Sequence, residues 1–175
     1  MEISEVKVRN EFFVSTLFVE TSITSYLSKQ LNIVDSVASE FLGNKPTSVR
    51  FEQKIDAVLD ADVLSIIDKS KLSVFKEIYK EFLSNPDAES LEESFVSSDA
   101  NDDFLLILYP QSEYLPREEK LTNACYQLIG EVSELVATLD NAPEVKISKG
   151  RKFANLDLFK LSRFATLFSL LFILK

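Results

Sequence analysis

The chain has 175 residues, of which 46% are hydrophobic, three are glycine and five are proline. This composition argues against long disordered or glycine-rich segments, and one domain is expected. A single cysteine and no histidine exclude an internal disulfide, a histidine- or thiolate-based zinc site and a Ser-His-Asp triad. The formal net charge of −9 is uneven: residues 1–142 carry 12 Lys+Arg against 26 Asp+Glu, whereas residues 143–175 carry a net charge of +5. An acidic body repels phosphate backbones and argues against nucleic-acid binding.

A first long helix is predicted from Asn10 to Asn32. One side of it carries Phe13, Leu17, Leu27 and Leu31, with Val14 and Phe18 beside them. Its many serines and threonines lower the helix propensity, so tertiary packing must hold it. The preceding residues lack the cationic start and the apolar run of a secretory signal, and we expect a cytoplasmic protein.

Two amphipathic helices follow a loop at residues 43–46, and Thr47 or Ser48 is expected to cap the first of them. Ser65 precedes Asp68 by three residues, a weak capping-box spacing that predicts the start of the second helix. The helical hairpin therefore turns near residues 62–65. Apolar residues recur at steps of three and four in both helices: Phe51, Ile55, Val58 and Leu59, then Leu72, Phe75, Ile78 and Phe82.

Beyond Pro86 an acidic, serine-rich connection leads to the apolar run 104–109 (FLLILY), which is too short to decide between a helix and an extended segment. A clearer helix is predicted from Arg117 to Leu139. Its apolar residues keep a heptad-like spacing: Leu121, Ala124, Cys125, Leu128, Val132, Leu135, Val136 and Leu139. Cys125 belongs to this stripe, so we interpret it as a buried packing residue rather than a reactive thiol.

The last segment, residues 143–175, combines a basic loop (KISKGRK) with a predicted helix from Phe153 to Lys175. The uncharged run from Phe164 to Leu174 is shorter than the ~20 residues that span a bilayer. A helix that is apolar on all sides must be buried, either on the protein's own bundle, in a partner or second copy, or in a membrane interface. The side chains expected to make these contacts are Phe164, Leu167, Phe168, Leu171 and Phe172.

The hairpin with its FEQK start and EIYKEFLSN end, together with the later helix EEKLTNACYQLIGEVSELV, resembles bacterial proteins of the HEPN superfamily, near the branch that includes the mannitol operon repressor. The resemblance spans about residues 12–139. It implies an all-α, HEPN-like helical bundle of about five or six helices for residues 1–142. In such proteins the third helix ends in the motif E-I-R-N-x-F-x-H-N, which corresponds here to the stretch from Glu77 to Asn85.

Active HEPN proteins are ribonucleases that use the arginine and the histidine of this motif across a dimer interface, assisted by the polar residue after the arginine. By position, Tyr79 replaces the arginine, Lys80 the polar residue and Ser84 the histidine. A phenol is neutral at pH 7, and a serine alone has no general base near neutral pH. We therefore expect no catalysis. These residues either line a surviving binding groove or pack in a dimer or bundle surface.

Two acidic patterns resemble metal sites only in part. Residues 99–103 (DANDD) alternate like the start of a calcium loop, but the turn glycine and the bidentate glutamate of such a loop are missing. Glu52, Asp56 and Asp60 lie one turn apart on one helix, without the histidines of di-iron bundles. We interpret the first pattern as a solvated loop and the second as surface charge, and expect no metal or other cofactor.

Together these patterns predict a non-catalytic helical interaction or regulatory protein. It is expected to act through protein–protein contacts, as a homodimer or with a protein partner, and no small-molecule substrate is evident. The partner-binding residues are expected to be Tyr79, Lys80 and Ser84, with the apolar residues of the last helix. The alternative is a peripheral membrane or toxin-like protein that acts through that last helix.

Overall fold

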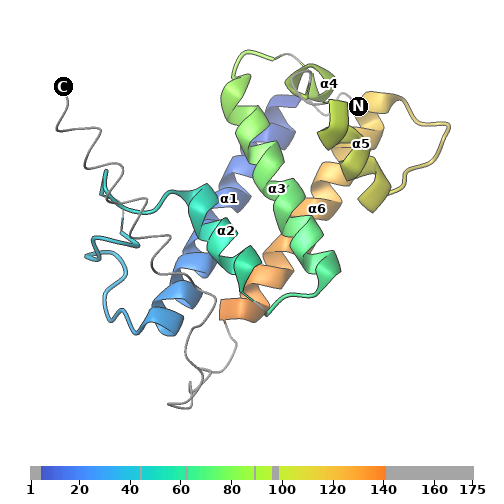
Figure 1. The fold of residues 1–175 in the computed structure, drawn as a ribbon. Coiled ribbons are helices and arrows are strands. Elements are labelled where there is room, and N and C mark those ends of the chain that lie inside the picture. Colours follow the sequence, from blue (N-terminus) through green and yellow to red (C-terminus); the bar gives the residue numbers. More distant parts are fainter. Residues whose placement is uncertain (1–4, 44, 62, 89, 96–98, 141–175) are drawn as a thin grey trace. The chain divides into compact units, whose positions relative to one another are not determined.

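All regular structure in the described part of the chain is helical. The computed structural model describes residues 5–43, 45–61, 63–88, 90–95 and 99–140. This part forms α1 (Glu5–Leu31), α2 (Phe51–Asp60), α3 (Ile66–Ser84), α4 (Leu91–Ser94), α5 (Asp99–Leu108) and α6 (Arg117–Asp140) (Figure 1). The expected all-α class is therefore confirmed for these residues, and their six helices fit the expected number.

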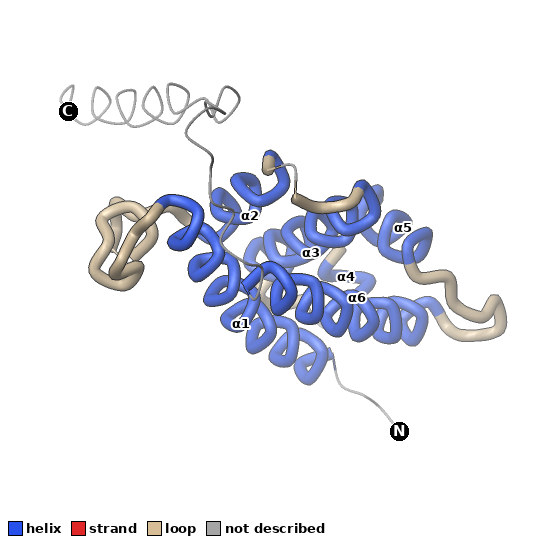
Figure 2. The backbone as a smooth tube through the Cα atoms, turned by 90° about the horizontal axis from the view of Figure 1, so that it is seen from below, coloured by secondary structure: helices blue, strands red, loops and turns tan. Residues whose placement is uncertain are grey.

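The bundle is built around its two longest helices, α1 and α6. They pack against each other along their length and run in the same direction, and α3 contacts both (Figure 1). α2 and α5 lie on opposite sides of α3, as the view in Figure 2 also shows. The short α4 packs on α6. This arrangement leaves one long face of α1 without a covering helix in the described part of the chain.

Aromatic rings fill the centre of the bundle. Phe12 of α1 stacks on Phe75 of α3 with 4.5 Å between the ring centroids, and it meets Phe82 edge-on at 5.1 Å. Phe95, directly after α4, lies 6.0 Å from Phe82. All four rings are buried, and such aromatic pairs add about 0.5–1.5 kcal/mol each beyond the area that they bury.

The helical hairpin agrees closely with its prediction. α2 ends at Asp60 and α3 begins at Ile66, on either side of the predicted turn. Ser65 caps α3 as expected, because its hydroxyl oxygen accepts a hydrogen bond from the Asp68 amide at 3.1 Å. Leu59 is half-buried, and the other predicted apolar positions are buried: Phe51, Ile55, Val58, Leu72, Phe75, Ile78 and Phe82.

The expected cap of α2 is wrong. Neither Thr47 nor Ser48 occupies the cap position, which belongs to Arg50. The backbone amide of Arg50 donates to the Gln53 side chain at 3.0 Å. The Ser48 hydroxyl instead donates to the Glu40 carbonyl at 3.1 Å, so it holds the preceding loop rather than the helix.

The acidic stretch directly before the apolar run 104–109 is helical. Residues 99–103 form the start of α5, so the expected solvated loop is wrong. Acidic side chains favour the positive end of a helix dipole, and the apolar residues after them give the helix a face to bury. Leu105 is fully buried on that face, and residues 104–108 are helical rather than extended.

The buried face of α1 coincides only in part with the predicted apolar side. Of the four residues on that side, Leu27 is buried and Phe13 half-buried, whereas Leu17 and Leu31 are exposed. The core takes mainly a neighbouring face: Val8, Phe12, Val19, Ile23 and Tyr26. The helix also begins at Glu5, earlier than expected. It ends where Asn32 adopts a φ of 54° and the Ile33 amide donates to the Ser28 carbonyl at 2.9 Å, a Schellman-type ending.

The clearest sequence pattern, that of α6, is confirmed. The helix runs from Arg117 to Asp140, against a prediction that ended at Leu139. Leu135 is half-buried, and the other apolar residues of the predicted stripe are buried. Cys125 is buried as expected, and burial raises the pKa of its thiol to about 12, so the reactive thiolate is scarce at neutral pH.

Candidate functional site

The three residues at the chemical positions of the resembled motif lie near the end of α3 on two different sides. Tyr79 is half-buried, and its ring meets Phe51 of α2 edge-on at 5.0 Å between centroids and Phe13 of α1 at 6.2 Å. Lys80 and Ser84 are exposed. The Ser84 hydroxyl donates to the Lys80 carbonyl at 2.8 Å. The three side chains therefore do not converge on one reaction centre.

Electrostatics keep the Tyr79 phenol protonated. Burial raises its pKa, and the nearby carboxylates of Glu52 and Glu20 raise it further. The Lys80 ammonium donates to Glu77 at 2.6 Å on the exposed side of α3. Neither residue thus offers the fixed, unpaired positive charge that a developing phosphorane needs.

Arginine is present near this end of α3, but it serves the fold. Arg9 of α1 donates to the carbonyls of Pro86 at 2.7 Å and Asn85 at 3.0 Å, and to the Ser94 hydroxyl at 2.7 Å. Its guanidinium also lies over the Phe82 ring, 5.4 Å from the centroid. A cation at the C-terminal end of a helix complements the helix dipole, so Arg9 joins α1, the end of α3 and α4.

The outward face of α1 is an apolar stripe made of residues from, and next to, the apolar side that the sequence indicates. It consists of Val14, Leu17 and Phe18, which are 68%, 66% and 48% exposed, and we call these three residues the α1 stripe. From Phe12 to Ser28 the sequence contains one charged residue, Glu20. A long surface helix with so little charge is typical of the centre of a protein–protein interface.

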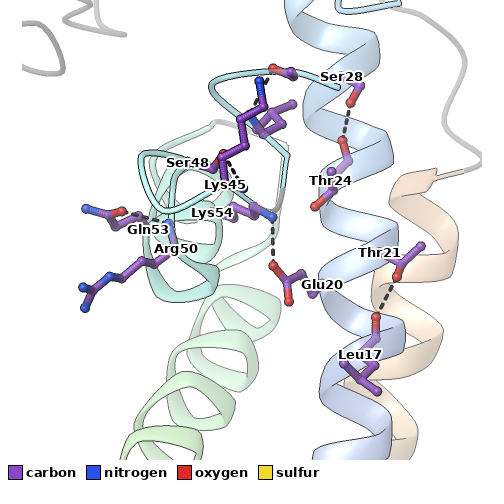
Figure 3. Close-up of polar contacts among 12 residues, drawn as sticks. Leu17, Glu20, Thr21, Thr24, Ser28, Lys45, Ser48, Arg50, Gln53 and Lys54 are labelled. Atoms are coloured by element: carbon purple, nitrogen blue, oxygen red, sulfur yellow. Dashed lines mark hydrogen bonds and ion pairs between the residues drawn. The ribbon is translucent and has the colours of Figure 1, made fainter. Parts of the chain in front are cut away.

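Glu20, the charged residue in this part of α1, forms an ion pair with a buried lysine. Lys54 of α2 is 2% exposed, and its ammonium donates to Glu20 at 2.8 Å (Figure 3). This pair is not predicted by the apolar spacing of either helix. The signal was present, because Lys54 falls between Phe51 and Val58 on the apolar face of α2, where a lysine needs a partner.

A pocket opens beside the ion pair. It lies between the second half of α1, the loop that follows it and Lys54, and its volume is about 690 Å³. Hydroxyl groups of α1 line one side of it: Thr21, Thr24, Ser25 and Ser28. Of these, the buried Thr24 hydroxyl has no hydrogen-bond partner within the described part of the chain.

The contact residues that were expected on the last helix lie outside the described residues: Phe164, Leu167, Phe168, Leu171 and Phe172. Among the described residues, no helix is long and apolar enough to cross a membrane. In the same part of the chain, no group of three or more Cys, Asp or Glu residues is arranged to hold a metal ion, and Asp56 pairs with Lys76 at 2.7 Å.

Comparison of the chain with protein-family models, with curated proteins and with solved structures finds no match.

Proposed function

We propose that this protein is a HEPN-like bundle without nuclease activity that acts by protein–protein contact, as a regulatory module whose first partner is a second copy of itself. The observation that carries the proposal is the α1 stripe. It presents three large apolar side chains to solvent on a helix whose central residues hold one charge, already paired with Lys54. Burying such a surface in a partner is favourable at about 25 cal/mol per Å² of apolar area.

The charge distribution favours a second copy on this face. Residues 1–142 carry 12 Lys+Arg and 26 Asp+Glu, so most approaches of two such bodies bring carboxylates together. The three residues of the α1 stripe carry no charge and add nothing to that repulsion. In an antiparallel pairing of two α1 helices, Leu17 of one copy meets Phe18 of the other, which is the self-complementary contact that a two-fold dimer requires.

The residues at the motif positions support the proposed absence of nuclease chemistry. Tyr79 is held by Phe51 and Phe13 with its phenol neutral, and Ser84 has no histidine to activate it. We expect the purified chain to leave single-stranded RNA intact. RNA cleavage that Tyr79→Phe or Ser84→Ala abolishes would contradict the proposal.

Solution mass tests the dimer directly. Light scattering after gel filtration of the full chain should give the mass of two copies, and Phe18→Asp should give the mass of one, because a carboxylate in the centre of the interface is left without a partner. Circular dichroism should show unchanged helix content, since Phe18 is 48% exposed in the single chain.

A matched control comes from α5. Ile107 is exposed and apolar like the residues of the α1 stripe, but it lies on another helix, so Ile107→Asp should leave the dimer mass unchanged. A monomeric parent chain, or dissociation by Ile107→Asp and not by Phe18→Asp, would contradict assembly through α1.

A further inference from the structure

We propose that the pocket beside Lys54 binds a small organic monocarboxylate with an apolar body. Its volume of about 690 Å³ falls in the range of small-molecule sites, roughly 300–1,000 Å³. The pocket shares Leu17 with the α1 stripe, whereas Val14 and Phe18 do not line the pocket. A variant at either position therefore separates the two proposals.

The Lys54 ammonium supplies the charge for an incoming anion. It carries three N–H donors, and within the described part of the chain it donates to Glu20 at 2.8 Å. Lys54 is 2% exposed and lines the pocket, so its ammonium lies at the pocket wall with little contact with bulk water. A buried donor without an acceptor is costly, and a carboxylate oxygen removes that cost.

A second polar contact lies one helical turn along α1 from Glu20. Thr24 points from α1 toward the side where Lys54 approaches (Figure 3). Its hydroxyl oxygen is buried without a partner, whereas the hydroxyls of Thr21 and Ser28 donate to backbone carbonyls of α1 at 2.8 and 2.7 Å. A carboxylate has two oxygens, so one can accept from Lys54 and the other from Thr24.

The Glu20 carboxylate beside Lys54 limits the negative charge that the pocket accepts. Glu20 and Lys54 pair at 2.8 Å, and both line the pocket. A monocarboxylate brings one negative charge to the Lys54 ammonium, whereas a dianionic phosphate adds repulsion from Glu20, and an amine meets the Lys54 ammonium. The rest of the lining offers apolar contact for a hydrocarbon body: Leu17, Ile33, Val34, Val37 and Leu42.

Octanoate is a suitable probe, with octanol, octylamine and octyl phosphate as matched ligands of equal chain length. Titration of the full chain, followed by NMR of the backbone amides, should show saturable octanoate binding with shifts centred on Thr24 and Lys54. Octanol and octylamine should bind at least about tenfold more weakly, because they lack the anion. Equal binding of octylamine, or tighter binding of octyl phosphate, would overturn the charge argument.

Two substitutions locate the site. Thr24→Val keeps the shape of the side chain but removes the hydroxyl, and should weaken octanoate binding about fivefold. Lys54→Met should abolish it. If Lys54→Met fails to fold, the octanoate affinity of Thr24→Val tests the proposal by itself. The matched control is Thr138→Val on the exposed side of α6, which should leave octanoate binding unchanged. Absence of saturable binding, or binding that Thr24→Val leaves unchanged, would overturn the proposal.

Discussion

α1 and α6 are the longest helices of the bundle and pack against each other, yet they differ in the residues on their outer faces. In α6 the apolar residues face inward, while charged residues such as Glu131 and Glu134 lie on its exposed or half-exposed sides. In the central part of α1 the one charged residue, Glu20, is paired with an interior lysine, and apolar residues face solvent. Charges therefore mark the outer face of α6, whereas the outer face of α1 has the composition of a surface that is buried in an assembly.

The largest expected difference in stability is between substitutions on the inner and outer faces of α1. Phe12→Ala removes a fully buried ring that stacks on Phe75, and should lower the free energy of unfolding by about 3–5 kcal/mol. Phe18→Ala, on the same helix, should cost the isolated chain under about 1 kcal/mol because the ring is 48% exposed.

Urea unfolding followed by circular dichroism measures both values, at a protein concentration low enough to keep any dimer dissociated. A cost for Phe18→Ala that equals the cost for Phe12→Ala would show that both faces of α1 are buried within one chain. The contrast between α1 and α6 would then disappear.

The next effect comes from the ion pair. Glu20→Gln leaves the Lys54 ammonium in the interior without its counter-ion and should cost about 2–3 kcal/mol. Lys54→Met should cost less, about 1 kcal/mol, because Met fills the same space and the Glu20 carboxylate, 32% exposed, keeps access to water. Thermal unfolding of both variants gives the order.

A control for this asymmetry is the pair on the outside of α3. Lys80→Met breaks an exposed contact with Glu77 and should change the stability by less than about 0.5 kcal/mol. If Lys54→Met is more costly than Glu20→Gln, the lysine is held mainly by its own packing and not by the carboxylate.

A smaller effect is expected where α1 begins. Arg9→Lys retains the charge but loses the planar fork that reaches the carbonyls of Asn85 and Pro86 and the Ser94 hydroxyl, at a cost of about 1 kcal/mol. Hydrogen exchange should become faster at the amides of α4, while the amides of α6 keep their protection. Equal loss of protection in both helices would indicate that Arg9 stabilises the whole bundle rather than this junction.

The sequence was most informative where charge and apolar spacing agree. In α3 and α6 polar residues separate the apolar ones, so one face is indicated, and the buried residues could be named in advance. In α1 the apolar residues surround the helix, and spacing alone cannot choose between the faces of Phe12 and Leu17. Lys54 shows a second limit: its position on an apolar face was visible, but its partner, distant in the sequence, depends on how α2 meets α1.

The smallest effect is expected on the outer side of α6, where Glu131 accepts from the Tyr109 hydroxyl at 3.0 Å and pairs with Lys71 at 2.7 Å. The bond from Lys71 is the main cause that lowers the pKa of the Glu131 carboxyl, with the bond from Tyr109 adding to it. Because the folded pKa is below the unfolded one, this contribution is complete above the unfolded value of about 4.3 and is lost as the pH falls through the folded value. The carboxylate is half-exposed, so the contribution should be about 0.5 kcal/mol or less.

Urea unfolding of the parent chain and of Glu131→Gln should show this difference at pH 7 and none near pH 3. A difference that grows on acidification would mean that folding favours the protonated form of Glu131, and the outer face of α6 would then lose the solvated charge that distinguishes it from the outer face of α1.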